Sequence, residues 1–161
     1  TQFTMDTFSW KPALIGLMFS ILGFQDIVSQ SFIMPKLLIQ LSDKQIAILG
    51  MVSEIIGYSF IAASALFSLY PLLIVGMLMY GFGDSIFGPS FNGMLSKSVS
   101  SSEQGRIQGG SQSIQALARM IGPIIGGQIY VSLGHAAPAF MGMILIVAAI
   151  AVLYKGTHAT V

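Results

Sequence analysis

The sequence has 161 residues, of which 54% are hydrophobic and 8% are charged, and its net charge is +1. Soluble globular proteins carry about 25% charged residues, so this composition, with a mean hydropathy of +0.81, indicates an integral membrane protein. The small net charge and the lack of a basic run argue against a nucleic-acid partner. Because the sequence has no cysteine, it has no disulfides, no thiolate nucleophile and no sulfur-bound metal, and we expect neither a metal nor another cofactor.

Apolar segments long enough to cross a bilayer follow one another along the chain. They cover residues 13–34, 45–69, 72–95, 105–131 and 137–154. A membrane-spanning helix needs about 20 residues, so each segment can form one. We therefore expect an all-α membrane protein in which residues 1–161 form a single bundle of five transmembrane helices.

Two of these segments are preceded by a capping-box pattern. Ser42 is followed three residues later by Gln45, and Ser100 by Glu103. In a capping box the hydroxyl and the longer side chain satisfy free backbone N–H groups at the start of a helix. The second and fourth helices are therefore expected to begin at these points.

Positive residues are distributed unevenly between the connections. Those that flank the first and third connections or follow the last segment are Lys36, Lys44, Lys97, Arg106 and Lys155. Because positive residues mark the cytoplasmic side, the amino end is predicted to lie outside the cell membrane and the carboxyl end inside. An odd number of spans that starts outside, with no initiator methionine, suggests the carboxyl portion of a longer multi-pass protein, whose missing amino-terminal helices would be its partner.

Four ionisable residues lie within the predicted spans: Asp26, Glu54, Asp84 and Arg119. Each opposes insertion at a helix centre by about 2.5–3.5 kcal/mol, so such residues are functional by default. Distances along the chain place Asp84 and Arg119 near the midplane, where they could form an ion pair. That pair could line a permeation path, or it could simply lock two helices together.

These four residues comprise three carboxyls and one guanidinium. Arg119 can hold one acid ionised, and at least one other acid should stay protonated until water or a substrate reaches it. The hypothesis is that Glu54 or Asp26 takes up and releases a proton during a working cycle.

Uncharged polar residues lie on the same helical faces as Arg119 and Asp84. Gln108, Gln112 and Gln115 precede Arg119 at steps of three and four, and Tyr80 and Asn92 share a face with Asp84. These five residues are therefore predicted to line a cavity. The alternative for the Tyr80–Asn92 face is small-residue helix packing, because Gly81, Gly83, Gly88 and Gly93 lie in the same helix.

A spaced glycine pattern occupies the fourth predicted span. It consists of Gly109, Ala118, Gly122, Pro123, Gly126 and Gly127. The spacing resembles the antiporter signature of the major facilitator superfamily, specifically of its drug:proton antiporters, which include the tetracycline efflux carriers. Ala118 departs from the signature by one methyl group, because the family has Gly there.

Other stretches place the resemblance in the second half of that family's twelve-helix fold. Residues 102–109 resemble the loop that enters helix eleven, so the chain would be equivalent to helices 8–12. On this alignment Glu54, after the similar lead-in ILGMVSE, falls where tetracycline carriers have a functional acid.

This resemblance implies a secondary active transporter that works by alternating access between two bundles. The implied activity is proton-coupled efflux of small organic compounds, with protons, a small-molecule substrate and the lipid bilayer as partners. Two alternatives stay open: proton-coupled uptake of a small solute, and a truncated membrane fragment that transports nothing. An enzyme is not expected, because the sequence has no phosphate-binding loop and no histidine within a span.

Overall fold

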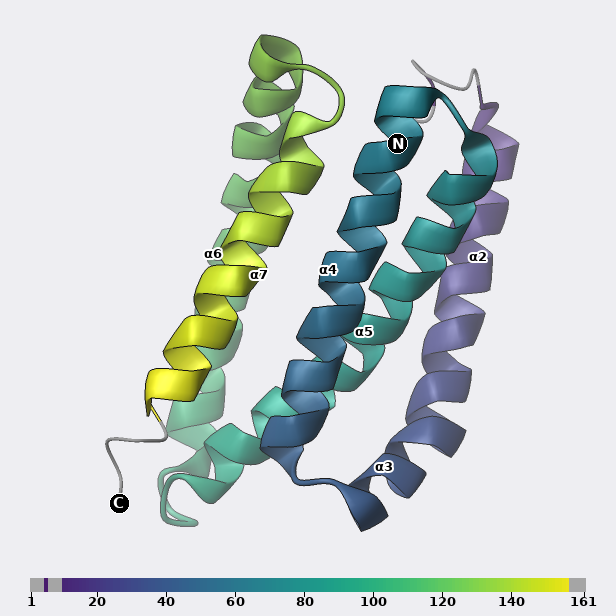
Figure 1. The fold of residues 1–161 in the computed structure, drawn as a ribbon. Coiled ribbons are helices and arrows are strands. Elements are labelled where there is room, and N and C mark those ends of the chain that lie inside the picture. Colours follow the sequence, from purple (N-terminus) through teal and green to yellow (C-terminus); the bar gives the residue numbers. More distant parts are fainter. Residues whose placement is uncertain (1–4, 6–9, 157–161) are drawn as a thin grey trace.

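A computed structural model describes residue 5 and residues 10–156, and the regular structure of this part of the chain is helical throughout (Figure 1). The elements are α2 (Pro12–Val28), η1 (Ser29–Ile33), α3 (Met34–Gln40), α4 (Asp43–Phe67), α5 (Tyr70–Lys97), α6 (Gln104–Leu133) and α7 (Ala137–Gly156). The first three form one continuous helix over Pro12–Gln40, and together with the others they give five helices that are long and apolar enough to cross a membrane. The predicted all-α architecture of five spans is confirmed.

The antiparallel pair α4 and α5 forms the centre of the bundle. Figure 1 shows α2 on the far side of α5, whereas α7 packs against α4, and α6 contacts α5 and α7. A hydrophobic core of Met34, Ile46 and Ile86 joins the end of the first helix to the α4–α5 pair. Helix α6 has no buried residue within the described part of the chain.

Glycines allow α4 and α5 to approach very closely. A Cβ atom added at Gly57 would lie 2.5 Å from the Tyr80 amide nitrogen and 2.8 Å from the Gly76 carbonyl oxygen. Likewise, a Cβ at Gly83 would lie 2.5 Å from the Gly50 carbonyl oxygen. Small residues at such contacts let two membrane helices pack backbone against backbone. Of these glycines, only Gly83 belongs to the set predicted from the sequence to serve helix packing.

One of the two predicted capping boxes forms. The Ser42 hydroxyl accepts a hydrogen bond from the Gln45 amide (3.4 Å), and the Gln45 side chain accepts one from the Ser42 amide (2.9 Å). The prediction for Ser100 and Glu103 is wrong, because α6 begins one turn later, with Glu103 as an N-cap that makes no side-chain capping bond. Instead, residues 101–103 form a turn in which the Ser100 hydroxyl donates to the Glu103 carboxylate (2.8 Å).

The first helix contains a π-helical turn that was not predicted from the sequence. It covers Ser29–Ile33, and the Met34 amide donates to the Ser29 carbonyl, five residues back. Pro35 has no N–H to donate to the carbonyl four residues before it, which interrupts the α-helical hydrogen bonding here. Such π turns are frequent at functional sites, and this one begins three residues after Asp26.

Basic residues gather at one end of the bundle. The α3–α4 connection, the α5–α6 connection and the end of α7 all lie at the lower end in Figure 1. These connections, the helical turns beside them and the end of α7 contain Lys36, Lys44, Lys97, Arg106 and Lys155. The fold therefore places at one level five cations that are distant in the sequence.

Candidate functional site

A polar cluster lies between α4 and α5, the two most closely packed helices. Glu54 and Tyr58 are one turn apart on α4, and Tyr80 and Asp84 are one turn apart on α5. The two tyrosine rings meet edge to face, with centroids 5.1 Å apart and an interplanar angle of 60°. Because α4 and α5 run antiparallel, the fold turns two local spacings of four residues into one cluster.

Asp84 connects this cluster to the other ionisable residues within the spans. It interacts electrostatically with Glu54 on α4, with Asp26 on α2 and with Arg119 on α6. Glu54 is 9% exposed, whereas the side chains of Asp26, Asp84 and Arg119 are exposed among the described helices. The structure thus brings the other two predicted acids, Asp26 and Glu54, and the Arg119 guanidinium around Asp84.

An electrostatic interaction does not by itself mean that Asp84 and Arg119 form a direct ion pair. Lys97 and Asp43 form an ion pair at one end of the bundle, whereas Arg119 and Asp84, both among the described residues, form no salt bridge with each other. The predicted direct ion pair between Asp84 and Arg119 is therefore not formed between the described helices, although the two side chains interact electrostatically.

Gln25, beside Asp26, joins α2 to α5. Its Nε2 donates to the Leu78 carbonyl oxygen at 2.8 Å, while its Oε1 is buried and has no hydrogen-bond partner in the described part of the chain. Gln30 donates to the Asp26 carboxylate at 2.8 Å. Gln25 was not among the predicted site residues, because a glutamine in an apolar span does not by itself indicate which neighbouring helix its side chain contacts.

A pocket of about 710 Å³ lies between α4, α6 and α7. Tyr58 lines it from α4, and Pro138 and Leu145 line it from α7. The α6 wall includes three glycines of the antiporter-like pattern: Gly122, Gly126 and Gly127. The other members of that pattern, Gly109, Ala118 and Pro123, lie elsewhere on α6.

None of the residues predicted to line a cavity lies in this pocket. Tyr80 belongs to the α4–α5 cluster, Asn92 is partly buried on α5, and Gln115 donates to the Ser111 hydroxyl at 3.2 Å. Gln108 and Gln112 are exposed. That these five residues line a cavity stays a prediction. The described helices leave the face of α6 that carries Gln108 and Gln112 uncovered.

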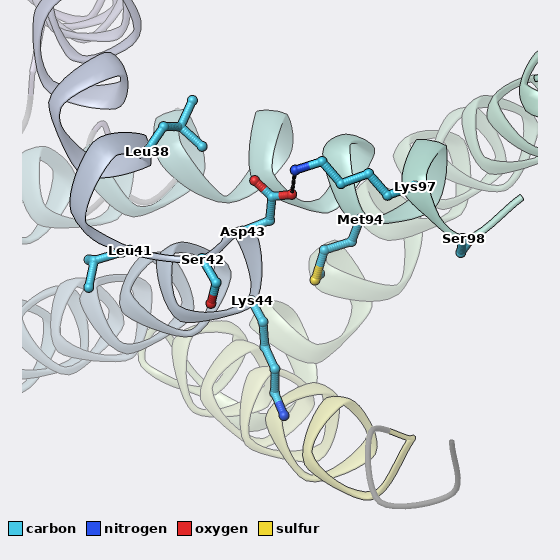
Figure 2. A pocket seen from close by; sticks show the side chains of 8 residues that line it. All are labelled: Leu38, Leu41, Ser42, Asp43, Lys44, Met94, Lys97 and Ser98. Atoms are coloured by element: carbon cyan, nitrogen blue, oxygen red, sulfur yellow. Dashed lines mark hydrogen bonds and ion pairs between the residues drawn. The ribbon is translucent and has the colours of Figure 1, made fainter. Parts of the chain in front are cut away.

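A second pocket, of about 570 Å³, lies between the start of α4 and the end of α5. Figure 2 shows the Asp43–Lys97 ion pair at this pocket and Lys44 pointing away from that pair. The ammonium of Lys44 lies 4.9 Å from the centroid of the Tyr154 ring, on α7. These two contacts connect α4 to α5 and to α7 at the basic end of the bundle.

Within the described residues, no three His, Cys, Asp or Glu side chains are grouped so that they could hold a metal ion.

The chain is similar to known proteins over most of its length. The family model of the Major Facilitator Superfamily matches residues 1–160. Tetracycline resistance protein, class C, of Escherichia coli is 30% identical over 129 residues, which cover 80% of this chain and 31% of that protein. The class G protein of Vibrio anguillarum is 30% identical over 146 residues, covering 90% and 35%.

A mammalian relative also matches. Solute carrier family 22 member 18 of Mus musculus is 28% identical over 143 residues, which cover 81% of this chain and 32% of that protein. The chain thus spans about a third of the length of the curated relatives it matches. No solved structure matches it.

Proposed function

The chain belongs to the Major Facilitator Superfamily, a family of membrane transporters, and we propose that it forms the part equivalent to helices 8–12 of a secondary active transporter that exports small organic compounds in exchange for protons. On this proposal residues 1–161 are one transmembrane domain, and the remaining helices of the transporter come from outside this sequence. The match to about a third of each relative supports that division.

The observation that carries the proposal is a set of three acids and one arginine, in which Asp84 is the acid that interacts with the other three residues. Its members come from α2, α4, α5 and α6, and Asp84 interacts electrostatically with each of the others. Ionisable residues at membrane depth mark ion pathways and proton relays. Because the acids outnumber the arginine, a proton can balance the charge that Arg119 leaves uncompensated.

Each member then has a distinct proposed role. Glu54, the most buried of the four, takes up and releases the transported proton. Arg119 provides the counter-charge to Asp84, and Asp26 is the second candidate proton carrier. Tyr58 and Tyr80, whose rings pack edge to face one turn from Glu54 and Asp84, hold α4 and α5 in register.

The polar face of α6 has the proposed role of a cavity wall. Gln108, Gln112 and Gln115 lie on a helix that buries no side chain against the described helices. Helices outside this sequence would complete the cavity that these residues and Asn92 line. The antiporter-like glycines would permit the helix movements of alternating access.

The location of the basic end supports an orientation in the cell membrane. Positive residues favour the cytoplasmic side, and the lower end of the bundle in Figure 1 carries the clustered lysines and Arg106. We therefore place the amino end outside and the carboxyl end in the cytoplasm.

Export is favoured over uptake by the tetracycline resistance relatives, because removal of a drug from the cell confers resistance to it. Uptake of a solute in symport with protons is the second candidate, and the solute carrier relative favours it. A fluorescent dye distinguishes the two in cells that produce the protein as its gene encodes it. For export we expect less dye inside these cells than in cells without the protein, and an uncoupler should abolish the difference. Unchanged accumulation would contradict export, and increased accumulation would favour uptake.

Arg119→Ala is expected to reduce transport strongly, and Asp84→Asn in the same protein should partly restore it. The reason is that the first change leaves the Asp84 carboxylate without its counter-charge, and the second removes that uncompensated charge. The check is transport rate in proteoliposomes that contain equal amounts of each variant. Rescue by Asp26→Asn instead of Asp84→Asn would show that Arg119 balances the acid on α2.

A further inference from the structure

The face of the first helix that meets the bundle shifts by one residue at the π-helical turn. Before and into the turn, this face follows steps of three and four, as an α-helix requires. Its buried and half-buried members are Ile15, Met18, Leu22, Gln25 and Ser29. The next buried residue, Met34, follows Ser29 at a step of five. The π turn at Ser29–Ile33 therefore contains the one extra residue that keeps both parts of the helix facing the bundle.

This face of α2 packs against α5 (Figure 1). The Gln25 Nε2 atom donates to the Leu78 carbonyl oxygen at 2.8 Å. A Cβ atom added at Gly81 would lie 3.0 Å from the Leu22 Cδ2 atom and 3.6 Å from the Gln25 Oε1 atom. Leu22 and Gln25 therefore lie on α5 at Gly81, which is one turn before Asp84.

A regular α-helix through the same residues would present a different face to α5. With Met34 kept in the core, steps of three and four back along the helix reach the residue after each present member. These residues, all exposed in the structure, are Gly16, Phe19, Gly23, Asp26 and Gln30. A shift of one residue is a rotation of about 100° around the helix axis. In that register Asp26 takes the place of Gln25.

Both faces are compatible with packing on α5. A Cβ atom added at Gly16 or Gly23 would meet no atom within 4 Å among the described residues, and small residues let membrane helices approach closely. The present register also leaves the buried Gln25 Oε1 atom without a hydrogen-bond partner in the described part of the chain. An orphaned buried acceptor opposes the gain from the Gln25 hydrogen bond to Leu78. The preference for the present register is therefore small.

Pro35 favours the π turn at this place. It has no N–H group, and in a regular α-helix its ring would clash with the carbonyl of Ser31, four residues before it. The Met34 amide donates instead to the Ser29 carbonyl, five residues back. Pro35→Ala would remove both obstacles to a regular helix without changing the number of residues.

We propose that the π-helical turn is a register switch that lets α2 present either Gln25 or Asp26 to α5. In one register the extra residue stays in the turn and Gln25 lies on α5. In the other the turn is α-helical, and α2 is rotated so that Asp26 approaches the face of α5 that carries Asp84. A role of this switch in proton coupling rests on the proposed export function, whereas the switch itself does not require transport.

The test is cross-linking of cysteine pairs between α2 and α5 with a short bifunctional thiol reagent. It uses membranes of cells that produce the protein as its gene encodes it, with all other cysteines replaced. Leu22→Cys with Gly81→Cys (the Leu22 pair) reports the present register, because the Leu22 side chain meets Gly81. Gly23→Cys with Gly81→Cys (the Gly23 pair) reports the rotated register. Phe24→Cys with Gly81→Cys gives the background, because Phe24 is 70% exposed and faces away from α5 in both registers. We expect the first two pairs to react above this background.

Two changes in the turn should move the registers in opposite directions. Pro35→Ala should raise the cross-linking rate of the Gly23 pair relative to the Leu22 pair by about tenfold or more, because it favours the regular helix. Deletion of Ser31 removes the extra residue, so a regular helix then keeps Leu22 and Gln25 on α5. This deletion should retain the Leu22 cross-link and abolish the Gly23 cross-link, with or without Pro35→Ala.

Pro12→Ala is the matched control. Pro12 lies in the first turn of α2, where a helix needs no N–H group. This variant should keep the ratio of the two cross-links within about twofold of the unmodified ratio. It shows whether loss of a proline from the first helix changes the ratio without acting on the π turn.

The proposal is overturned if the Gly23 pair stays at background both without and with Pro35→Ala, if deletion of Ser31 leaves the ratio unchanged, or if Pro12→Ala changes it as much as Pro35→Ala does. A deletion variant that folds poorly would lose the Leu22 cross-link as well, and the comparison of Pro35→Ala with Pro12→Ala then decides. Cross-linking reports the register even if the protein moves no protons. Export that survived deletion of Ser31, with the Gly23 cross-link absent, would overturn the role in proton coupling alone.

Discussion

Glu54→Gln should abolish uphill export driven by a pH gradient while the protein still folds. The amide has nearly the shape of the carboxyl and cannot release a proton in the physiological range. In enzymes a positioned proton-transfer group contributes about 10²–10⁴-fold to the rate, so we expect export to fall by about 100-fold or more. The measurement is accumulation of a dye in inverted proteoliposomes with an imposed pH gradient.

A second measurement separates proton coupling from substrate binding. Exchange of labelled for unlabelled substrate across the membrane needs no net proton movement, and the Glu54→Gln protein should retain it. Glu103→Gln is the matched control, because Glu103 lies in the connection before α6 rather than in a span. If uphill export survived in Glu54→Gln but not in Asp26→Asn, the proton carrier would be the acid on α2.

Gly57→Val is expected to prevent stable association of α4 and α5. Even the first carbon of the new side chain would lie 2.5 Å from the Tyr80 amide nitrogen and 2.8 Å from the Gly76 carbonyl oxygen. Both atoms belong to the backbone and cannot turn aside as a side chain could, so the helices must separate. Overpacking a core typically costs about 1–3 kcal/mol, and backbone clashes on both sides place this variant at or above the upper end.

The readout is the yield of monodisperse protein and its thermal midpoint in detergent. Gly23→Val provides the control, since Gly23 lies on α2 and an added Cβ there meets no atom within 4 Å among the described residues. The control should keep a midpoint close to that of the unmodified protein. Equal loss in both variants would mean that the effect comes from valine in a membrane helix rather than from the α4–α5 contact.

Much of the architecture could be predicted from local features. A composition of 54% hydrophobic and 8% charged residues requires a membrane environment, and segment length then requires helices, because each backbone polar group must be satisfied within its own segment. The Ser42–Gln45 capping box was equally local, and it formed as predicted. The spaced glycines from Gly109 to Gly127 were sufficient to indicate the family.

The residues that meet across helices were harder to predict. Gly57 and Gly76 contact each other, yet in the sequence they are ordinary glycines in apolar helices. The sequence did not mark Tyr58 as part of a polar cluster. It also did not show that the Gln25 side chain hydrogen-bonds to the Leu78 carbonyl oxygen. Conversely, the polar face of α6 was conspicuous in the sequence but is not enclosed by the described helices.

The sequence by itself therefore determined the number of spanning helices and the ionisable residues within them, since both depend on transfer from water to lipid, a property of each segment alone. The tertiary structure decided which faces meet: the glycine contacts between α4 and α5, the Tyr58–Tyr80 pair, and the position of Asp84 among Asp26, Glu54 and Arg119. In a bilayer the lipid tails are as apolar as the side chains, so hydrophobicity does not mark the buried face of a helix. Close packing and polar contacts select that face, and both depend on the neighbouring helix.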